Sequence, residues 1–153
     1  MDQSGQPHTP RFRVAVTRLD GRRARAEAHG QVLELAIKGS DPSLGFTAPE
    51  TLIAAFGACM LSNVTRGAAE LGLRVDEASV LFDGAKRTEP LGIDPLRYQL
   101  VIRSPEPPAA LEELYRRATT DGTATNALLG GMTPEGELIV EAPTGTSTRP
   151  ESL

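Results

Sequence analysis

One long apolar segment in the middle of the chain limits the folds that this sequence can adopt. It starts at Thr47-Ala48-Pro49-Glu50, a capping box with a proline in the first turn, and Gly72 stands where such a helix would end. We therefore expect a helix over residues 47–71, roughly 36 Å long at 1.5 Å per residue. Residues 52–61 are apolar on nearly every side, so other parts of a protein must surround them.

Alternating apolar and polar residues predict three strands before this helix. They cover residues 11–17, 22–28 and 31–37, with turns at Asp20-Gly21 and at His29-Gly30. The chain is therefore expected to open with a three-stranded meander, followed by a loop that leads into the helix.

After the helix, residues 75–82 and 96–103 predict a hairpin with a long connection over residues 88–92. Three prolines then introduce a second, amphipathic helix that ends at about Thr120, and residues 138–140 predict a last short strand. The expected order is β-β-β-α-β-β-α-β, which is an α+β fold.

The length of 153 residues favours one domain, which we expect over residues 11–142. Residues 1–10 form a polar leader and residues 143–153 a tail rich in Pro, Ser and Thr. One unit of this size has trouble covering the central helix completely. We therefore expect a homodimer in which two such helices share the middle.

The composition excludes several classes of protein. One cysteine and two histidines without metal-type spacing argue against a disulfide scaffold, a metal site and a Ser-His-Asp triad. A net charge of −4 disfavours nucleic acid and membrane surfaces as partners. No secretory signal is visible, and ten apolar residues cannot cross about 30 Å of hydrocarbon. We expect a cytoplasmic protein without metal or cofactor.

Cys59 is the only soft nucleophile of the chain. A free cysteine is most often a small buried apolar side chain, and reactivity requires a thiolate that a cation or a helix N-terminus stabilises. Cys59 lies twelve positions past Thr47, so the cation must come from elsewhere in the fold. The basic segment near the start of the chain contains Arg11, Arg13, Arg18, Arg22, Arg23 and Arg25. One of these arginines can supply the cation, or the segment can be a solvated strand face. A weaker alternative is that it binds nucleic acid.

Glu50 is explained by the capping box alone, but it also lies on the same helix as Cys59. Nine residues at 100° each place the two side chains on opposite sides, roughly 13 Å apart along the axis. They cannot cooperate within one helix. In an antiparallel pair of helices, Glu50 of one chain can approach Cys59 of the other through an arginine.

The segment from Phe46 to Cys59, Phe-Thr-Ala-Pro-Glu-Thr-Leu-Ile-Ala-Ala-Phe-Gly-Ala-Cys, resembles the signature of the OsmC/Ohr family of osmotically induced and organic-hydroperoxide-resistance proteins. The order of elements is similar over residues 12–142. This resemblance implies an intertwined α+β homodimer with its sites at the subunit interface. It also implies reduction of organic hydroperoxides by a cysteine of the helix, assisted by an arginine and a glutamate, in defence against oxidative stress.

The resemblance assigns the peroxidatic cysteine to Cys59 and the glutamate at the helix start to Glu50. The arginine follows the first turn of the meander, so Arg22 is the first candidate and Arg23 the second. An apolar wall that favours organic over inorganic peroxides is expected from Leu52, Phe56 and Met60.

One departure from the family pattern concerns the second cysteine, because Gly122 stands where that residue is expected. A sulfenic acid on Cys59 would then need an external thiol, or it would oxidise further. Two functions therefore stay open. One is a one-cysteine thiol peroxidase, and the other is a non-catalytic homodimer that binds a small hydrophobic molecule at its interface.

Overall fold

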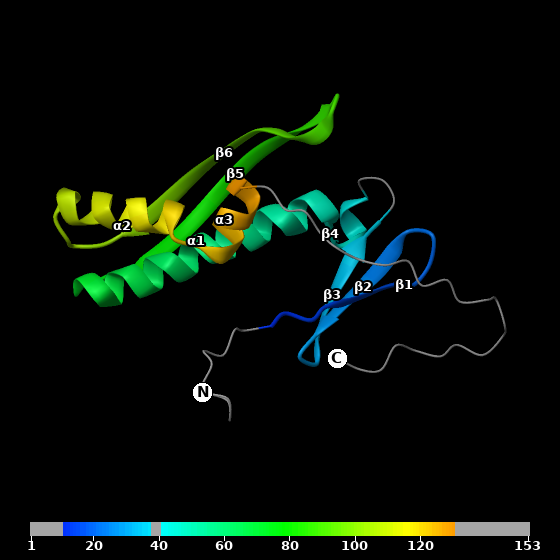
Figure 1. Cartoon of the computed structure of the whole chain (residues 1–153), viewed down its shortest axis with the longest axis horizontal. Coiled ribbons are helices and arrows are strands. Elements are labelled where there is room, and N and C mark those ends of the chain that lie inside the picture. Colours follow the sequence, from blue (N-terminus) through cyan, green and yellow to red (C-terminus); the bar gives the residue numbers. More distant parts are fainter. Residues whose placement is uncertain (1–10, 38–40, 131–153) are drawn as a thin grey trace. The chain divides into compact units, whose positions relative to one another are not determined.

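The computed structural model describes residues 11–37 and 41–130, which form two compact units divided between Ala48 and Pro49. The first unit is a small sheet, and the second contains three helices and a long hairpin (Figure 1). The expected leader, tail and strand at 138–140 lie outside the described residues. A single domain over residues 11–142 stays a prediction.

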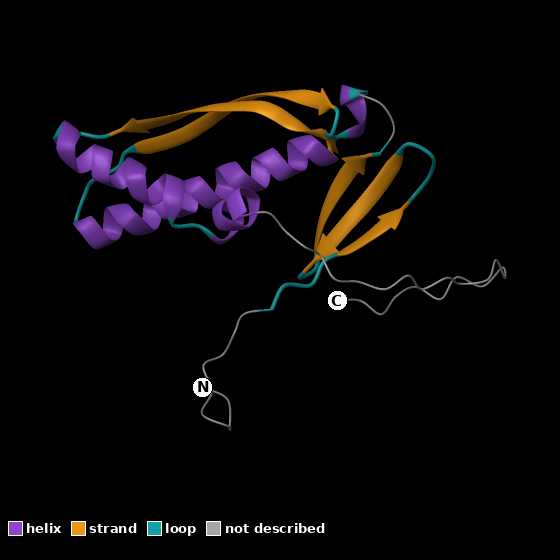
Figure 2. Cartoon of the chain, turned by 45° about the horizontal axis from the view of Figure 1, so that its top comes forward, coloured by secondary structure: helices purple, strands orange, loops and turns teal. Residues whose placement is uncertain are grey.

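The first unit confirms the predicted meander and adds a fourth strand (Figure 2). Its elements are β1 (Ala15–Arg18), β2 (Arg23–Ala28), β3 (Gln31–Ala36), the 3-10 turn η1 (Pro42–Leu44) and β4 (Phe46–Thr47). The first three strands are antiparallel, and β4 pairs with β3 in parallel over two residues.

The two turns of the meander follow from their residues. His29 and Gly30 have φ of 52° and 76°, as a two-residue hairpin turn with the twist of its strands requires. In the other turn, the carboxylate of Asp20 accepts bonds from the backbone amides of Arg22 (2.8 Å) and Arg23 (2.9 Å). This Asp side chain replaces ladder partners that the turn cannot provide.

The start of the meander differs from the expected half-buried strand. β1 begins at Ala15, and the expected inward residues Phe12, Val14 and Val16 are all more than half exposed. The alternation is present in the sequence, but in a single chain it does not form a buried face.

The long central helix is confirmed as α1 (Ala48–Leu71), which belongs to the second unit from Pro49 onward. Its end has the expected glycine: Gly72 has φ of 65°, and the Leu73 amide donates back to the Ala68 carbonyl at 2.8 Å. These bonds satisfy carbonyls that the helix end would otherwise leave unpaired.

The hairpin is longer than predicted. β5 (Glu77–Thr88) pairs antiparallel with β6 (Leu91–Arg103), and only Glu89 and Pro90 connect them. The expected long connection over 88–92 is therefore wrong. Polar, Gly and Pro residues near the tip suggested a loop, yet the backbone ladder continues through them up to the pair Thr88 and Leu91.

The core of the second unit lies between α1, the hairpin and α2 (Pro108–Thr120). Val64 and Ala68 of α1 pack with Leu114 and Ala118 of α2, and all four are buried. Partly buried apolar residues from the following segments surround them: Leu73, Val75, Ala78, Leu100, Ile102 and Leu111.

Nearer the start of α1, Phe56 contacts two aromatic rings of the hairpin. Its ring centroid lies 5.4 Å from that of Phe82 and 6.4 Å from that of Tyr98, and the latter ring meets Phe56 edge-on. This cluster fixes the rotation of α1 about its axis, because it holds one face of the helix against β5 and β6.

By length and composition alone, α1 would suffice to cross a membrane. A core helix of a soluble protein passes the same test, so length and composition alone are weak evidence for a membrane span. Seven residues of α1 are buried within the second unit: Phe56, Gly57, Met60, Asn63, Val64, Gly67 and Ala68. A third helix, α3 (Thr123–Gly130), follows α2 after a short turn and was not predicted from the sequence.

Candidate active site at Cys59

Cys59 lies on the face of α1 that meets the turn between α2 and α3. Asn63 and Arg66 follow it at spacings of four and seven residues, so the three side chains share one face of the helix. The turn residue Gly122 lies directly against the sulfur. The partly buried thiol of Cys59 thus sits where three helices of the second unit come together.

Gly122 is buried, and the space beside its α-carbon is already occupied. A β-carbon at this position would collide with Cys59 Sγ and would lie 2.8 Å from both Asn63 Nδ2 and Thr125 Oγ1. Glycine is therefore the residue that lets the turn approach the sulfur. The position at which the family resemblance expects a second cysteine is in contact with Cys59.

The surroundings of the sulfur lower the pKa of the Cys59 thiol. Burial raises this pKa, but the backbone amide and the hydroxyl of Thr125, the amide of Ala124 and the charge of Arg66 together outweigh burial. Ala124 and Thr125 belong to the first turn of α3, whose amides have no partners inside the helix. A helix N-terminus therefore does help to lower the pKa of Cys59, but it is the N-terminus of α3 and not that of α1.

Arg66 connects α1 to the turn that carries Gly122. Its Nη2 donates to the backbone carbonyl of Asp121 at 3.0 Å and to Asn63 Oδ1 at 3.2 Å, while Glu70 lies 3.9 Å from its Nε. The sequence argument missed Arg66 because it sought the cation outside the helix. The spacing of seven residues from Cys59, nearly two turns, was the signal that could have found it.

Thr125 is fully buried, and although its hydroxyl lies near enough to influence the Cys59 thiol, its oxygen forms no hydrogen bond within residues 11–37 and 41–130. A buried hydroxyl without a partner costs roughly 1–3 kcal/mol. Asn63, also buried, donates to the Ala118 carbonyl over a long 3.5 Å. Polar groups with spare hydrogen-bonding capacity therefore gather beside the sulfur.

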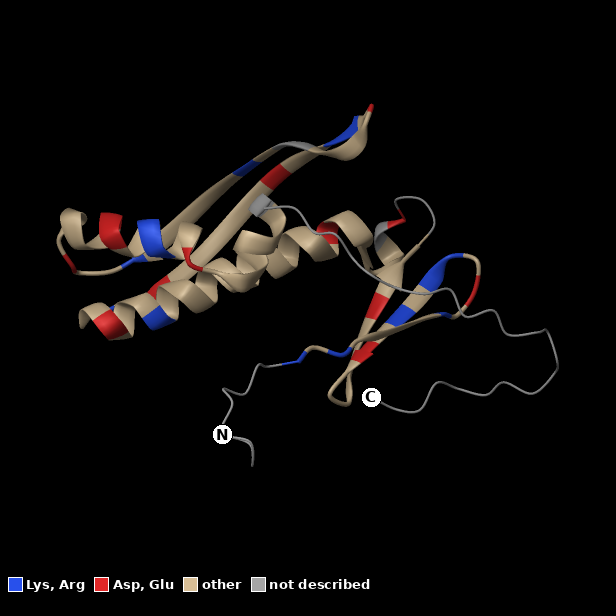
Figure 3. Cartoon of the chain, viewed as in Figure 1, with Lys and Arg blue, Asp and Glu red and all other residues tan. Residues whose placement is uncertain are grey.

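The predicted arginines Arg22 and Arg23 lie in the first unit, where each has an acidic partner. Arg22 Nη2 pairs with Asp41 at 2.6 Å, and Arg23 Nη2 pairs with Asp20 at 2.8 Å. Acidic and basic residues share the strands of this unit (Figure 3). The role of either arginine at the sulfur stays a prediction.

The predicted helper Glu50 is exposed at the start of α1. It lines a groove of about 500 Å³ with Ile53 of α1 and with Leu91 and Ile93 of the hairpin. Cys59 instead faces α3. The two side chains therefore point away from each other within one chain, as the helical spacing requires.

The expected apolar wall lies on α1 with different degrees of burial. Met60 is fully buried, Phe56 is buried in the aromatic cluster, and Leu52 is partly exposed. All three are placed by the same helix as Cys59. Their contact with a substrate stays a prediction.

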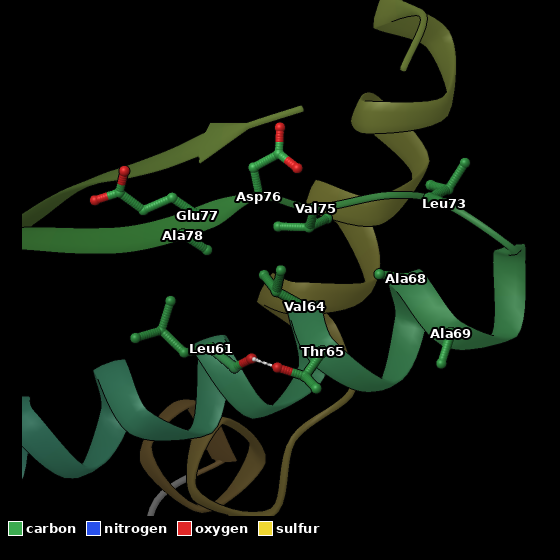
Figure 4. A pocket seen from close by; sticks show the side chains of 10 residues that line it. All are labelled: Leu61, Val64, Thr65, Ala68, Ala69, Leu73, Val75, Asp76, Glu77 and Ala78. Carbon is green, nitrogen blue, oxygen red and sulfur yellow. Dashed lines mark hydrogen bonds between the residues drawn. The ribbon is translucent and has the colours of Figure 1, made fainter. Parts of the chain in front are cut away.

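A second groove, of about 460 Å³, lies between the later half of α1 and the start of β5 (Figure 4). Its floor is apolar, and Asp76 and Glu77 stand at one side. It is separate from the sulfur. Across the residues that the structure describes, no group of three His, Cys, Asp or Glu side chains could hold a metal ion.

The fold and the site define a class of protein with one thiol on a central helix, packed against a long hairpin. A model of the OsmC-like protein family matches residues 39–135, which is more than half of the chain. The chain therefore belongs to the OsmC-like family. A search of curated proteins found no match.

Solved structures confirm the fold. An OsmC-like protein from Mycoplasma pneumoniae has a TM-score of 0.74 at 16% identity, over 80% of this chain and 90% of that one. The organic hydroperoxide resistance protein OhrB of Bacillus subtilis has a TM-score of 0.58 at 20% identity, over 78% and 92%. An organic hydroperoxide resistance protein from Elizabethkingia anophelis has a TM-score of 0.61 at 18% identity, over 80% and 92%.

Proposed function

We propose that this protein reduces organic hydroperoxides with the thiolate of Cys59 and is recycled by an external thiol. One observation carries the proposal: the sulfur of the only cysteine of the chain lies beside the N-terminus of α3, and its surroundings lower the pKa of the thiol. A lowered pKa provides the thiolate that such a reaction needs. Two proteins of the same fold are named organic hydroperoxide resistance proteins, which supports the choice of substrate.

The chemistry needs one sulfur and one peroxide. The Cys59 thiolate attacks the terminal oxygen of R–O–O–H, the O–O bond breaks, and the sulfur becomes a sulfenic acid, S–O–H. The leaving RO⁻ takes a proton from solvent and departs as the alcohol. Sulfur is oxidised by two electrons and the peroxide is reduced by two.

Recycling needs two external thiol groups, because Cys59 has no second cysteine in the chain. The first thiol condenses with the sulfenic acid, releasing water and forming a mixed disulfide. The second displaces Cys59 as a thiol and leaves with the first as a disulfide. A cysteine that must return to the thiol works best in a reducing compartment, so we place the protein in the cytoplasm.

The helix α1 also supports a homodimer. An exposed stripe of small and polar residues follows it at helical spacing, formed by Ala55, Ala58, Ser62, Thr65 and Ala69. In an antiparallel dimer through this helix, Glu50 of one chain acts at Cys59 of the other together with an arginine, Arg22 or Arg23. The apolar side chains beside the substrate are then Leu52, Phe56 and Met60. Light scattering tests the dimer; a mass of one chain at micromolar concentration contradicts it.

The activity is tested by mixing the reduced protein with cumene hydroperoxide and trapping the sulfenic acid with dimedone. Wild type should gain one dimedone per chain and consume peroxide faster than free cysteine does at the same pH. Cys59→Ser should do neither. Turnover should require added thiol. Peroxide consumption no faster than that of free cysteine rejects the proposal.

The apolar groove beside Glu50 favours the second candidate, a non-catalytic homodimer that binds a small hydrophobic molecule. Its size is within the range of small-molecule sites, and Ile53, Leu91 and Ile93 give it an apolar lining. An environment-sensitive apolar dye distinguishes the two functions. Binding that Ile53→Asp abolishes, in a protein whose Cys59 ignores peroxide, supports the second candidate.

A further inference from the structure

Four groups from two helices, α1 and α3, meet beside Gly122, where a β-carbon would stand. They are the sulfur of Cys59, the amide nitrogen of the Asn63 side chain, the hydroxyl oxygen of Thr125, and the start of α3 itself. The side chains of Asn63 and Thr125 are both buried, at 5% and 0% exposure. Polar groups withdrawn from water to this degree need a partner inside the protein.

The first turn of α3 presents donors to this point. The Asn126 amide donates to the Gly122 carbonyl at 2.8 Å and closes the first turn, so the amides of residues 123–125 precede the first helical bond. The amides of Ala124 and Thr125 act on the sulfur. α3 carries no charged residue that would compete for them.

The Thr125 hydroxyl is the least satisfied of these groups, because its oxygen is buried without a partner. A threonine in a helix commonly donates to the carbonyl four residues before it, here that of Asp121. That carbonyl accepts from Arg66 at 3.0 Å, and the Thr125 hydroxyl does not bond to it. A neutral thiol is a weak acceptor, whereas a thiolate is a strong one. The hydroxyl has no partner in the part of the chain that the structure describes, and the sulfur lies beside the same face of Gly122, so an anionic sulfur is the acceptor that fits its proton.

We infer that Thr125 is a catalytic residue of this site, because its hydroxyl donates to the Cys59 thiolate. Together with the first-turn amides of α3 it forms a set of donors around the sulfur, which we call the cradle. This inference rests on the proposed function for its purpose, but the cradle itself can be measured without peroxide. The charged groups on the surrounding elements are Arg66 of α1 and Asp121 of the turn. On α2, Arg117 is already paired with Glu113 and Glu70.

The test measures the thiol pKa from the pH dependence of alkylation by iodoacetamide, which reports one sulfur because the chain has one cysteine. Thr125→Val keeps the shape and removes the hydroxyl, and should raise the midpoint by about one pH unit. Thr125→Ser should keep the wild-type midpoint. Thr88→Val, the same change at an exposed position at the end of β5, is the matched control and should also leave it unchanged.

A wild-type measurement covers the case in which Thr125→Val does not fold. In ¹⁵N-labelled protein, the amide resonances of Ala124 and Thr125 should titrate with the alkylation midpoint, and they should stop doing so in Cys59→Ser. A folded Thr125→Val protein with an unchanged midpoint overturns the inference, as do amide resonances that ignore the ionisation of Cys59.

The two proposals fail separately. If Thr125→Val moves the thiol midpoint but the wild-type protein consumes no hydroperoxide, the cradle is supported and the peroxidase function is contradicted. If the wild-type protein turns over hydroperoxide but Thr125→Val leaves the thiol midpoint unchanged, the peroxidase function is supported and the role of Thr125 is contradicted.

Discussion

The sulfur of Cys59 occupies the place where any residue other than glycine at position 122 would carry its β-carbon. This contact joins the central helix to the turn that precedes α3. It also means that the reactive atom helps to form the packing of the turn, so stability and reactivity depend on the same contact.

Gly122→Ala should therefore destabilise the protein. The added β-carbon must displace Cys59 Sγ, Asn63 or Thr125, which we expect to cost about 1–3 kcal/mol of unfolding free energy. Urea unfolding measures the change. Gly21→Ala is the matched control, because its nearest neighbour is the end of the Arg18 side chain at 3.8 Å. Equal stabilities of the two variants would contradict the contact.

Leu114 is fully buried between α1 and α2, so Leu114→Ala should leave a cavity beside Val64 and Ala68. We expect a loss of roughly 2–5 kcal/mol in unfolding free energy. Leu81→Ala removes the same atoms from a residue that is 68% exposed, and should change stability by less than about 0.5 kcal/mol. Thermal unfolding of both variants compares them, and similar losses would place Leu114 outside the core.

Glu113 should make stability depend on acid pH. Bonds from Arg116 and Arg117 lower its pKa to about 2, from an ordinary value of 4.5. Because the folded value is the lower one, the stabilisation is present above pH 4.5 and is lost as pH falls towards 2.

The measurement is the unfolding free energy between about pH 5 and pH 2, an interval that covers the pKa of Glu113 in the unfolded and in the folded state. Glu113→Gln should flatten its decline towards acid pH. Glu112→Gln removes a neighbouring charge without breaking the pairs with Arg116 and Arg117, so it should keep the wild-type slope. A slope that Glu113→Gln leaves unchanged would show that this carboxylate does not titrate differently in the folded state.

Tyr98 should ionise late in alkaline titration. Burial and the 3.0 Å hydrogen bond with Tyr115 raise its pKa to about 12. Tyr115→Phe removes that bond and leaves one tyrosine, so the phenolate absorbance reports Tyr98 alone. Its pKa should fall towards the ordinary value and stay above it, because burial remains. Thr120→Val on the same helix should not move it.

Much of the fold follows from local signals that agree with the tertiary structure. Pro49 and Gly72 mark the two ends of α1, and the Asp20 and His29-Gly30 turns set the meander. The hairpin tip was misjudged because Gly84 and Gly92 weaken a strand locally, whereas cross-strand pairing carries the ladder past both glycines to Thr88 and Leu91. α3 was missed because its eight residues include two threonines and an asparagine, which favour turns as much as helices.

The sequence predicted the reactive residue of the site but not the residues around it. Cys59 could be chosen because the chain contains no other cysteine, and its distance from the start of α1 correctly excluded that helix end as its support. The support from Thr125 could not be foreseen, because it depends on α3 folding back onto α1 across 66 residues of sequence, from 59 to 125. Tertiary contacts of this separation leave no periodic trace in a single sequence.

The Arg66 side chain holds the Asp121 carbonyl and also acts on the sulfur with its charge. Arg66→Ala would therefore remove a charge and a hydrogen bond to the turn before α3 at once, so this variant cannot separate the two effects. A methylated or citrullinated arginine analogue, installed chemically, would be needed to ask which of them the thiol senses.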